Sequence, residues 1–305
     1  MKISVILPTY NRADILNRTI KNVLNQTYSE FDLIIINDAS CDETLDVVKK
    51  YISKDARIKL INNYKNLGCA KSRECGLAAA NYDYIVFIDD DDFWDENKLL
   101  KQINSMNINA ADIVICDYYI ESVNQKTYKS MKGFVKNFKK QILQKPGPFF
   151  QSIMIKKELF KLINNPFDTK SIPSEDWNFF IELSKINPKF SHINQPLFTW
   201  KLHNNNQSLN IAKEAKALIN IIDKHYEYIL YEQGTSIIAN HYRRIARLYE
   251  KLNDKENIKM YYLKAFKINP INFKNIFYYI CVVIGYEKTK SLINYMRILR
   301  GVPNA

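Results

Sequence analysis

Short β-rich runs alternate with amphipathic stretches along the first 120 residues. Each run is apolar over four or five positions, as expected of a strand that is buried on both faces, and the stretches between them repeat apolar residues at helical spacing. This alternation predicts an α/β fold, a mostly parallel sheet with helices on both faces. The predicted strands are Ile3–Leu7, Leu33–Ile36, Ile58–Ile61, Tyr84–Ile88 and Ile113–Cys116, and the predicted helices begin near Asp14, Asp42, Gly68 and Asn97.

The pattern changes twice in the rest of the chain. Residues 121–150 are polar and rich in lysine, which predicts a loop or lid. Strands at Gln151–Ile155 and Pro196–Trp200 then flank a helix that opens at Ser174. After about residue 210 the pattern is helical only, and residues 238–270 resemble one tetratricopeptide unit. We expect a sheet domain over residues 1–208 and a basic helical region over residues 209–305.

Composition and charge narrow the class of protein. The chain has 305 residues, of which 47% are hydrophobic and 25% charged, so a folded protein is expected. Residues 201–305 carry 17 Lys and Arg against 8 Asp and Glu, a net charge of +9, which favours an anionic partner. The late apolar stretch Ile276–Tyr286 is about half a membrane span, so we expect a soluble or peripheral protein and not an integral one. The basic carboxyl third favours peripheral contact with an anionic membrane. No nucleic-acid-binding motif accompanies the basic residues, so nucleic acid is not expected as a partner.

The cysteines and the missing motifs exclude several chemistries. Five cysteines show no C-x-x-C pair and no zinc spacing, and their odd number without a signal segment favours the reducing cytosol. The apolar run at the amino terminus is too short for a signal peptide and predicts a strand instead. The chain has no Ser-His-Asp order and no Walker loop, so hydrolase and NTPase chemistry lacks its residues.

Four aspartates, Asp89 to Asp92, follow the predicted strand Tyr84–Ile88 without a break. At about 4 Å and an effective dielectric near 20, each like-charged pair costs roughly 4 kcal/mol before screening. A divalent cation with oxygen ligands would relieve this repulsion, and open α/β sheets bind ligands at the carboxyl ends of their strands. A solvated acidic turn is the alternative. Two large aromatic residues, Phe93 and Trp94, follow directly and disfavour it.

Five segments, in this order and spacing, resemble family 2 glycosyltransferases with the GT-A fold. A single Asp-x-Asp triplet is common by chance, but five motifs in the family's order are specific. The resemblance runs from residue 3 to about residue 208 and implies a nucleotide-sugar donor, Mn²⁺ or Mg²⁺, and inversion at the anomeric carbon. The segments are Ser4–Arg12, Ile36–Thr44, Asn66–Arg73, Phe87–Asp92 and Ser174–Trp177, with a late motif from Trp200 to Ser208.

The resemblance assigns the acidic row to the metal and to the donor. It implies that Asp91 binds the cation with Asp89 as its partner, and that Asp90 faces the ribose. In the late motif, Lys201 is expected to neutralise phosphate charge, and His203 to reach the metal or a phosphate oxygen; a surface histidine is the alternative. Asp92 is the odd carboxylate, and we expect it to cap the next helix.

The same resemblance outlines a nucleotide pocket. Asp38 is expected to accept a hydrogen bond from N3 of uracil or thymine, which favours a UDP-sugar; an Asx-turn at the end of the strand is the alternative. For Lys71 and Arg73, in the segment Asn66–Arg73, the alternative is a basic helix face that is exposed to solvent. The residues implied for the other walls are Pro8, Thr9, Tyr10 and Arg12, together with Lys71 and Arg73 near the base or diphosphate.

An inverting displacement needs one base for the acceptor hydroxyl. The resemblance gives this role to Asp176 and lets Glu175 orient the acceptor or the base; acidic residues in the first turn of a helix are the alternative. The role of Trp177, core or sugar platform, stays open. The expected acceptor is a surface glycan or lipid-linked oligosaccharide. A non-catalytic scaffold on the same fold is the competing hypothesis, suggested by the tetratricopeptide-like unit.

Overall fold

In the computed structural model, which describes residues 1–202, 210–285 and 289, the chain divides into two units. The first, called the sheet unit here, comprises Met1–Ile142, Pro146–Thr169 and Glu175–Asn206. The second, the helical unit, comprises Leu143–Lys145, Lys170–Ser174 and Gln207–Ala305. Two short segments from the middle of the sequence therefore belong to the helical unit, and one of them leads directly into the Glu175-Asp176 pair.

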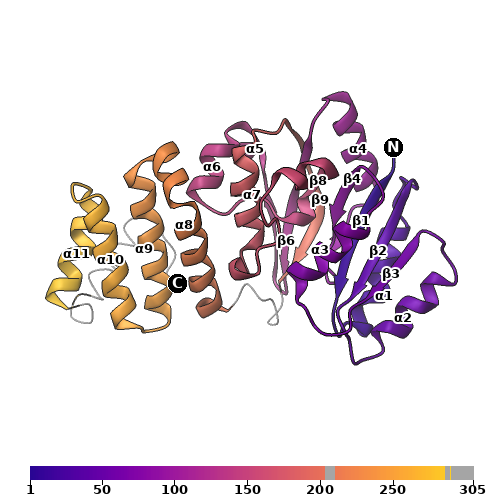
Figure 1. Cartoon of the computed structure of the whole chain (residues 1–305), viewed down its shortest axis with the longest axis horizontal. Coiled ribbons are helices and arrows are strands. Elements are labelled where there is room, and N and C mark those ends of the chain that lie inside the picture. Colours follow the sequence, from indigo (N-terminus) through magenta and orange to yellow (C-terminus); the bar gives the residue numbers. More distant parts are fainter. Residues whose placement is uncertain (203–209, 286–288, 290–305) are drawn as a thin grey trace. The chain divides into compact units, whose positions relative to one another are not determined.

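The parallel half of the sheet positions the predicted nucleotide pocket (Figure 1). Strand β1 (Ile3–Thr9) lies between β2 (Phe31–Asn37) and β4 (Tyr84–Phe87), and β3 (Ile58–Asn62) extends the sheet beyond β2, all of them parallel. Every residue of β1 and β2 is buried, which explains their nearly continuous apolar sequences. The predicted α/β fold is confirmed.

The second half of the sheet is mixed. Strand β8 (Ile153–Lys156) lies antiparallel between β4 and β6 (Ile113–Ser122), and β9 (Phe190–Lys201) runs parallel to β6. The short β5 (Phe93–Trp94) pairs with β9, and β7 (Gln125–Lys129) pairs with β6. The strand order is β3-β2-β1-β4-β8-β6-β9-β5, with β7 beside β6. The ends of β6 and β9 thus belong to the same sheet as the ends of β1 and β4.

Helices α1 (Ala13–Leu24), α2 (Thr44–Ile52), α3 (Cys69–Ala79) and α4 (Lys98–Ile108) follow their predicted starts closely. A Cβ atom at Gly76 of α3 would lie 2.5 Å from Cγ2 of Ile6 and 2.8 Å from Cδ1 of Ile36. Glycine therefore allows α3 to lie directly on β1 and β2. Asp14 lies within the first turn of α1, whose N-cap is Arg12, so this residue does not cap the helix that was predicted to begin near it.

The predicted loop at residues 121–150 is also wrong. Strand β6 continues to Ser122, β7 follows after a tight turn, and α5 (Lys132–Lys136) and α6 (Phe138–Gln144) occupy most of the remainder. Among the described strands β7 pairs with β6 alone, and four of its five residues, Gln-Lys-Thr-Tyr-Lys, carry polar side chains typical of an edge strand. Since neither face of β7 is buried in the core, its sequence lacks the apolar alternation by which a strand is predicted.

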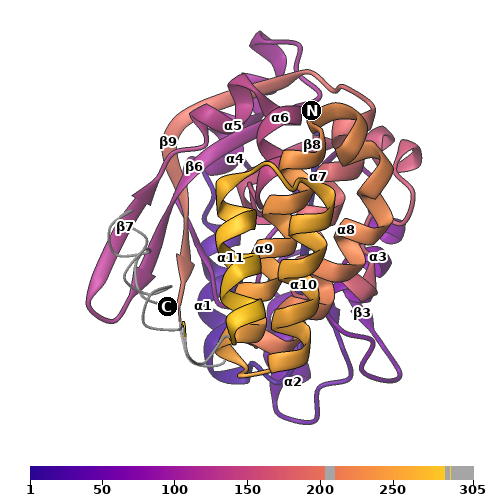
Figure 2. The same cartoon turned by 90° about the vertical axis from the view of Figure 1, so that its left-hand side faces the viewer.

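The helical unit contains α8 (Ile211–Gln233), α9 (Thr235–Lys251), α10 (Lys255–Ile268) and α11 (Phe273–Ile284). These helices lie side by side in sequence order in Figure 1, and Figure 2 views them with α11 in front. In the α9–α10 pair the rings of Tyr249 and Tyr261 stack at 5.8 Å, and the Tyr262 hydroxyl donates to Glu250 at 2.8 Å. Within the described residues, no helix combines the length and apolar character needed to cross a membrane.

Candidate active site

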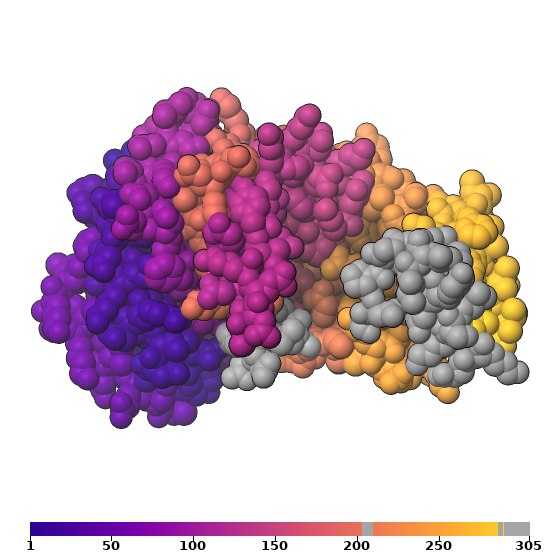
Figure 3. Space-filling model, turned by 180° about the vertical axis from the view of Figure 1, so that it is seen from behind, coloured from indigo at the N-terminus to yellow at the C-terminus, as the bar shows by residue number. Residues whose placement is uncertain are grey.

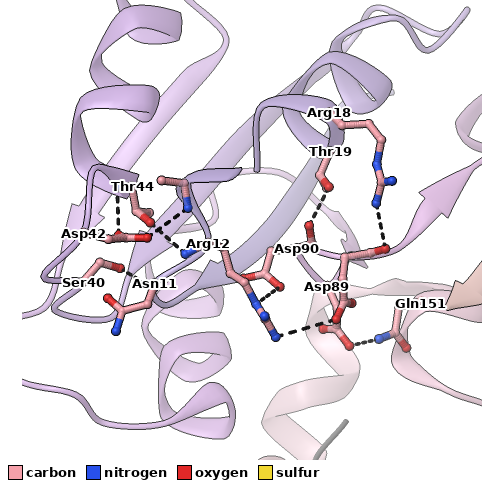
Figure 4. Close-up of polar contacts among 12 residues, drawn as sticks. Asn11, Arg12, Arg18, Thr19, Ser40, Asp42, Thr44, Asp89, Asp90 and Gln151 are labelled. Carbon is pink, nitrogen blue, oxygen red and sulfur yellow. Dashed lines mark hydrogen bonds and ion pairs between the residues drawn. The ribbon is translucent and has the colours of Figure 1, made fainter. Parts of the chain in front are cut away.

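The acidic row lies at the carboxyl end of β4, and side chains of α1 hold its backbone (Figure 4). The Thr19 hydroxyl donates to the carbonyl oxygen of Asp90 at 2.6 Å, and Arg18 donates to that of Asp91 at 3.4 Å. Farther along, the Asn22 amide exchanges two hydrogen bonds with the backbone of Trp94. Because two successive turns of α1 hold the backbone of the row and of Trp94 after it, the backbone itself places the four carboxyl groups.

Cationic and amide side chains contact the first three carboxyl groups of the row. Arg12 lies 3.5 Å from Asp90 and 3.9 Å from Asp91, measured from guanidinium nitrogen to carboxylate oxygen. Asp89 receives a hydrogen bond from Arg73 at 2.7 Å and another from the side chain of Gln151. The structure therefore brings Arg12 and Arg73, which sequence reasoning assigned to the donor pocket, onto the predicted metal-binding carboxylates.

The fourth carboxyl group differs from its neighbours. Asp92 is buried and accepts a hydrogen bond from the backbone N–H of Lys201 at 3.4 Å. The next helix, α4, has Asn97 as its N-cap, so the prediction that Asp92 caps it is wrong. Asp92 instead joins the row to the end of β9. The ammonium of Lys201 lies 3.9 Å from Glu121, and His203 lies outside the described residues.

Burial and mutual repulsion act together on the row. Burial, followed by the negative charge of Asp91, raises the pKa of Asp90 to about 7, against the opposing effects of Thr9 and Arg12. Burial also raises the pKa of Asp89, with Arg73 opposing it, and burial and the neighbouring aspartates raise that of Asp92. Without a cation, the protein thus disfavours the state in which all four carboxyl groups are ionised. A bound cation would favour that state.

Oxygen donors of this kind fit Mg²⁺ or Mn²⁺. Across residues 1–202, 210–285 and 289, no group of three or more His, Cys, Asp or Glu side chains is arranged to hold a metal ion. Magnesium, however, is commonly bound through one or two carboxylates together with water and substrate phosphates. Asp89 and Asp91, the two residues predicted to bind the metal, can supply this smaller set.

Arg73 joins the row to the predicted catalytic pair. Its side chain is only 5% exposed and donates to Asp89 and to Glu175, each at 2.7 Å. Glu175 and Asp176 form the first turn of α7 (Glu175–Lys185). Two acidic motifs that are far apart in the sequence therefore meet at one guanidinium. Lys71, by contrast, is exposed and pairs with Glu74 at 2.5 Å, which supports the solvated alternative for this lysine.

The indole of Trp177 belongs to the core. It is fully buried, and its N–H donates to the carbonyl oxygen of Ile142 at 2.7 Å, so the sugar-platform interpretation of this residue is wrong. The carboxylate of Asp176 accepts a hydrogen bond from the backbone N–H of Trp177 at 2.7 Å and is half-buried. Trp177 thus anchors α7 on its inner side, next to Asp176.

The predicted nucleotide pocket gathers at the ends of β1 and β2. The backbone N–H of Asp38 donates to the carbonyl oxygen of Thr9 at 2.9 Å, and Pro8 and Thr9 are buried in β1, whereas Tyr10 is exposed. The Asp38 carboxylate accepts from Asn63 at 2.7 Å and from the backbone N–H groups of Leu67 and Gly68 at 2.9 and 2.8 Å. Asp38 therefore also fixes the turn that precedes α3.

Sequence reasoning missed two polar side chains near the row and the pair. Gln151 precedes β8 and contacts Asp89, and its only sequence signal is a polar residue at the start of an apolar strand. Tyr118 lies on β6 beside a register shift of the β6–β9 pairing. Burial, and then the negative charge of Asp176, raises the pKa of Tyr118, so this ring lies near the predicted base. No motif in the sequence indicates it.

Solved structures first define the class. Staphylococcus aureus TarS (residues 1–349), determined with UDP-GlcNAc, superposes with a TM-score of 0.63 and 18% identity over 94% of this chain and 92% of TarS. The sheet order, and the acidic row at the strand ends, therefore belong to a protein with the GT-A fold.

The family follows from the sequence comparisons. Residues 4–165 match the model of glycosyl transferase family 2, and an uncharacterized Haemophilus influenzae glycosyltransferase is 34% identical over 183 residues, 60% of this chain and 72% of that protein. This chain belongs to glycosyl transferase family 2 and is an enzyme. Escherichia coli WfaP, a UDP-Glc:α-D-GlcNAc-diphosphoundecaprenol β-1,3-glucosyltransferase, is 38% identical over 119 residues, 39% of this chain and 47% of WfaP.

Proposed function

We propose that this enzyme transfers a hexose from a UDP-sugar, with inversion and with Mn²⁺ or Mg²⁺, to a hydroxyl of a glycan carried on a lipid. The observation that carries this proposal is the Arg73 bridge, because two bonds of 2.7 Å hold Asp89 of the acidic row and Glu175 beside the predicted base in one site. WfaP uses a UDP-sugar and a lipid-linked acceptor, and TarS binds UDP-GlcNAc, which supports the same classes of donor and acceptor here.

The nucleotide would lie against the ends of β1 and β2. Asp38 is fixed by three donors and would accept from N3 of uracil, with Thr9 and Tyr10 forming the adjoining wall. Asp90 would face the ribose. Arg12 lies between the nucleotide side and the row, since it contacts Asp90 and Asp91. An Arg guanidinium in this position can also pair with diphosphate oxygens.

Asp89 and Asp91 would hold the cation. When bound, the ion supplies positive charge that stabilises the diphosphate as it leaves the sugar. The ammonium of Lys201 would add to this charge from the end of β9. Arg73 remains paired with Asp89 and Glu175, so its contribution is to keep both acidic groups in place. In this position it does not need to contact the nucleotide itself.

Asp176 would act as the base. The acceptor oxygen attacks the anomeric carbon as its proton passes to the Asp176 carboxylate, and the bond from that carbon to the UDP oxygen breaks on the opposite face. One displacement of this kind inverts the anomeric configuration. General-base catalysis typically accelerates a reaction by about 10²- to 10⁴-fold, which sets the expected effect of removing the carboxylate.

A lipid-linked acceptor requires the enzyme to work at a membrane surface, and the helical unit has suitable side chains. Exposed apolar residues of α11 form one stripe of Phe273, Ile280, Val283 and Ile284, and part of α11, in yellow, lies at the surface in Figure 3. Helices α10 and α11 together carry five lysines and one glutamate. Anionic lipid attracts such a surface by about 1 kcal/mol per basic residue. Sedimentation with anionic vesicles at low and high salt tests this contact, and binding that is absent at low salt would contradict it.

The function is tested by calorimetry with UDP, GDP and dTDP, with and without Mn²⁺, and by assays with a panel of UDP-sugars. Asp176→Asn should bind UDP like the wild type but lose at least 10²-fold in kcat, whereas Asp91→Asn should lose the Mn²⁺-dependent part of UDP binding. Asp46→Asn, an exposed residue of α2, is the matched control and should change neither. Tighter binding of GDP than UDP would contradict the assignment of Asp38, and turnover by Asp176→Asn would contradict the assignment of the base.

A further inference from the structure

Three aromatic rings of the sheet unit form a continuous cluster that we call the aromatic wall: Tyr118 of β6, Phe149 before β8, and Trp200 of β9. The ring centroids of Tyr118 and Phe149 lie 5.3 Å apart, and those of Phe149 and Trp200 lie 4.9 Å apart. Phe198 stacks behind Tyr118 at 5.0 Å. Tyr118 and Phe198 are buried, whereas Phe149 and Trp200 are half-buried, so the last two expose ring surface to solvent.

Two of the segments that carry the aromatic wall are hydrogen-bonded to the acidic row. Gln151, two residues after Phe149, donates a hydrogen bond to Asp89. Lys201, which follows Trp200, donates its backbone N–H to Asp92 at 3.4 Å. Burial, and then the negative charge of Asp176, raises the pKa of Tyr118, so this ring lies within the electrostatic reach of the predicted base. The wall is therefore connected to the acidic row by two hydrogen bonds and lies within the electrostatic reach of Asp176.

The chemistry of the wall selects a ligand. Aromatic rings carry a negative face, which attracts the polarised C–H groups on the less polar face of a pyranose. The three rings contribute no cation, so phosphate is a poor partner for them. The nucleotide side of the site, with Arg12 and Asp38, lies at the ends of β1 and β2, whereas the wall is carried by β6, β9 and the segment before β8.

We propose that the aromatic wall binds the terminal pyranose ring of the acceptor, and that it presents a hydroxyl of that ring to Asp176. This inference rests on the proposed function, because it takes Asp176 as the base. It also narrows the acceptor: a ring sugar stacks on Phe149 and Trp200, whereas an open-chain polyol phosphate has no flat apolar face to offer.

Tryptophan fluorescence tests the wall without turnover. The chain has three tryptophans, and Trp94 and Trp177 are fully buried, so iodide should quench mainly Trp200. The probe is N-acetylglucosamine α-diphosphate on a short alkyl chain, added in the presence of UDP and Mn²⁺. It should protect the wild type from iodide, and the protection should vanish in Trp200→Phe. Poly(ribitol phosphate) should protect little; equal protection by both compounds would overturn the proposal.

Kinetics provide the second measurement. Trp200→Ala and Phe149→Ala should raise the acceptor KM by about tenfold, at the upper end of the energy of an aromatic contact, and leave the Kd of UDP unchanged. Trp200→Phe should keep the acceptor KM within about threefold, which separates loss of the ring from misfolding. Tyr231→Ala on α8, where the ring is 88% exposed, is the control. A rise in the Kd of UDP without a rise in the acceptor KM would overturn the proposal.

The two experiments also separate this inference from the proposed function. If the wild type turns over none of the UDP-sugars, the proposed function fails, whereas protection of Trp200 by the probe still supports a sugar site at the wall. If turnover occurs but neither the Trp200 nor the Phe149 variant changes the acceptor KM, the wall is not the acceptor site and the proposed function stands.

Discussion

The side chain of Lys98 is fully buried, and burial disfavours its charged form. Lys98 begins α4 in the sheet unit, and its ammonium donates to the side-chain oxygen of Gln102 at 2.8 Å and lies 4.1 Å from the centre of the Trp94 ring. No acidic side chain is among these contacts. Burial lowers its pKa from 10.5 to about 8. Since one pKa unit corresponds to about 1.4 kcal/mol, the folded state binds this proton about 3 kcal/mol less favourably than the unfolded chain does.

The sign of the pH dependence follows. Below pH 8 both states hold the proton and the full penalty applies; between pH 8 and 10.5 the folded state loses its proton first, so stability rises with pH. By roughly pH 9.5 the gain from this group should be about 2 kcal/mol. Lys98→Met removes the group and with it the gain. At neutral pH the variant also loses the cation–π contact and leaves Gln102 without its donor, losses of about 1–2 kcal/mol each that offset the relieved penalty.

The assay is urea unfolding followed by tryptophan fluorescence, since Trp94, Trp177 and Trp200 all lie in the sheet unit. The difference in free energy of unfolding between the wild type and Lys98→Met should shift towards the wild type by about 2 kcal/mol from pH 7 to roughly pH 9.5. Lys101→Met, on the same helix and partly exposed beside Asp95, is the control and should show no such shift. Parallel curves for the wild type and Lys98→Met would refute the reasoning.

Three further predictions concern the candidate site. Arg73→Met should lower the free energy of unfolding by about 3–5 kcal/mol, because it leaves two carboxylates, one of them Glu175, without their cation, and Arg73→Lys should restore only part of this loss; equal urea midpoints would contradict it. Asp38→Asn should cost about 1–3 kcal/mol and weaken UDP binding, since its amide NH₂ replaces an oxygen that accepts from Gly68 or from Asn63 and Leu67, and so meets a donor instead of donating to an acceptor; calorimetry that finds unchanged UDP affinity would be the contrary result. Ser174→Ala removes a 2.8 Å hydrogen bond to Glu214 of α8, so kcat should fall severalfold at constant donor KM, and an unchanged kcat would count against it.

The sequence predicts best where the signal is local. Strands β1 and β2 are buried on both faces, so their continuous apolar runs identify them directly, and α2 and α3 begin where polar residues and glycine precede an apolar repeat. Strand β7 fails because an edge strand needs no apolar face. Strand β9 was predicted only from Pro196 onwards, since its first half mixes exposed and buried positions around a register shift.

The candidate site shows a different limit. The acidic row can be predicted from the sequence, because four adjacent aspartates after a strand are unusual in themselves. The side-chain contacts of the site cannot be predicted in this way, because Arg73 and Glu175 are 102 residues apart and Gln151 and Asp89 are 62 apart. Helical or strand periodicity carries no information over such distances. Sequence reasoning consequently placed Arg73 near the base or the diphosphate, whereas its side chain forms ion pairs with two carboxylates.

The balance of charge in the site implies an order of binding. Among the described residues, the carboxyl groups of Asp89, Asp90, Asp91 and Glu175 pair with two guanidiniums, those of Arg12 and Arg73, while the guanidinium of Arg18 donates to the backbone of Asp91. Acidic groups are therefore in excess before any substrate arrives, and the charge of Asp91 adds to burial, the larger cause, in raising the pKa of Asp90. A diphosphate brings further negative charge, so UDP alone should be repelled, while a divalent cation should bind the row first or together with the nucleotide. Calorimetry should accordingly find that the affinity for UDP is at least tenfold weaker in the presence of a chelator. Equal affinity with and without Mn²⁺ would mean that the guanidiniums of Arg12 and Arg73 already suffice to bind the diphosphate.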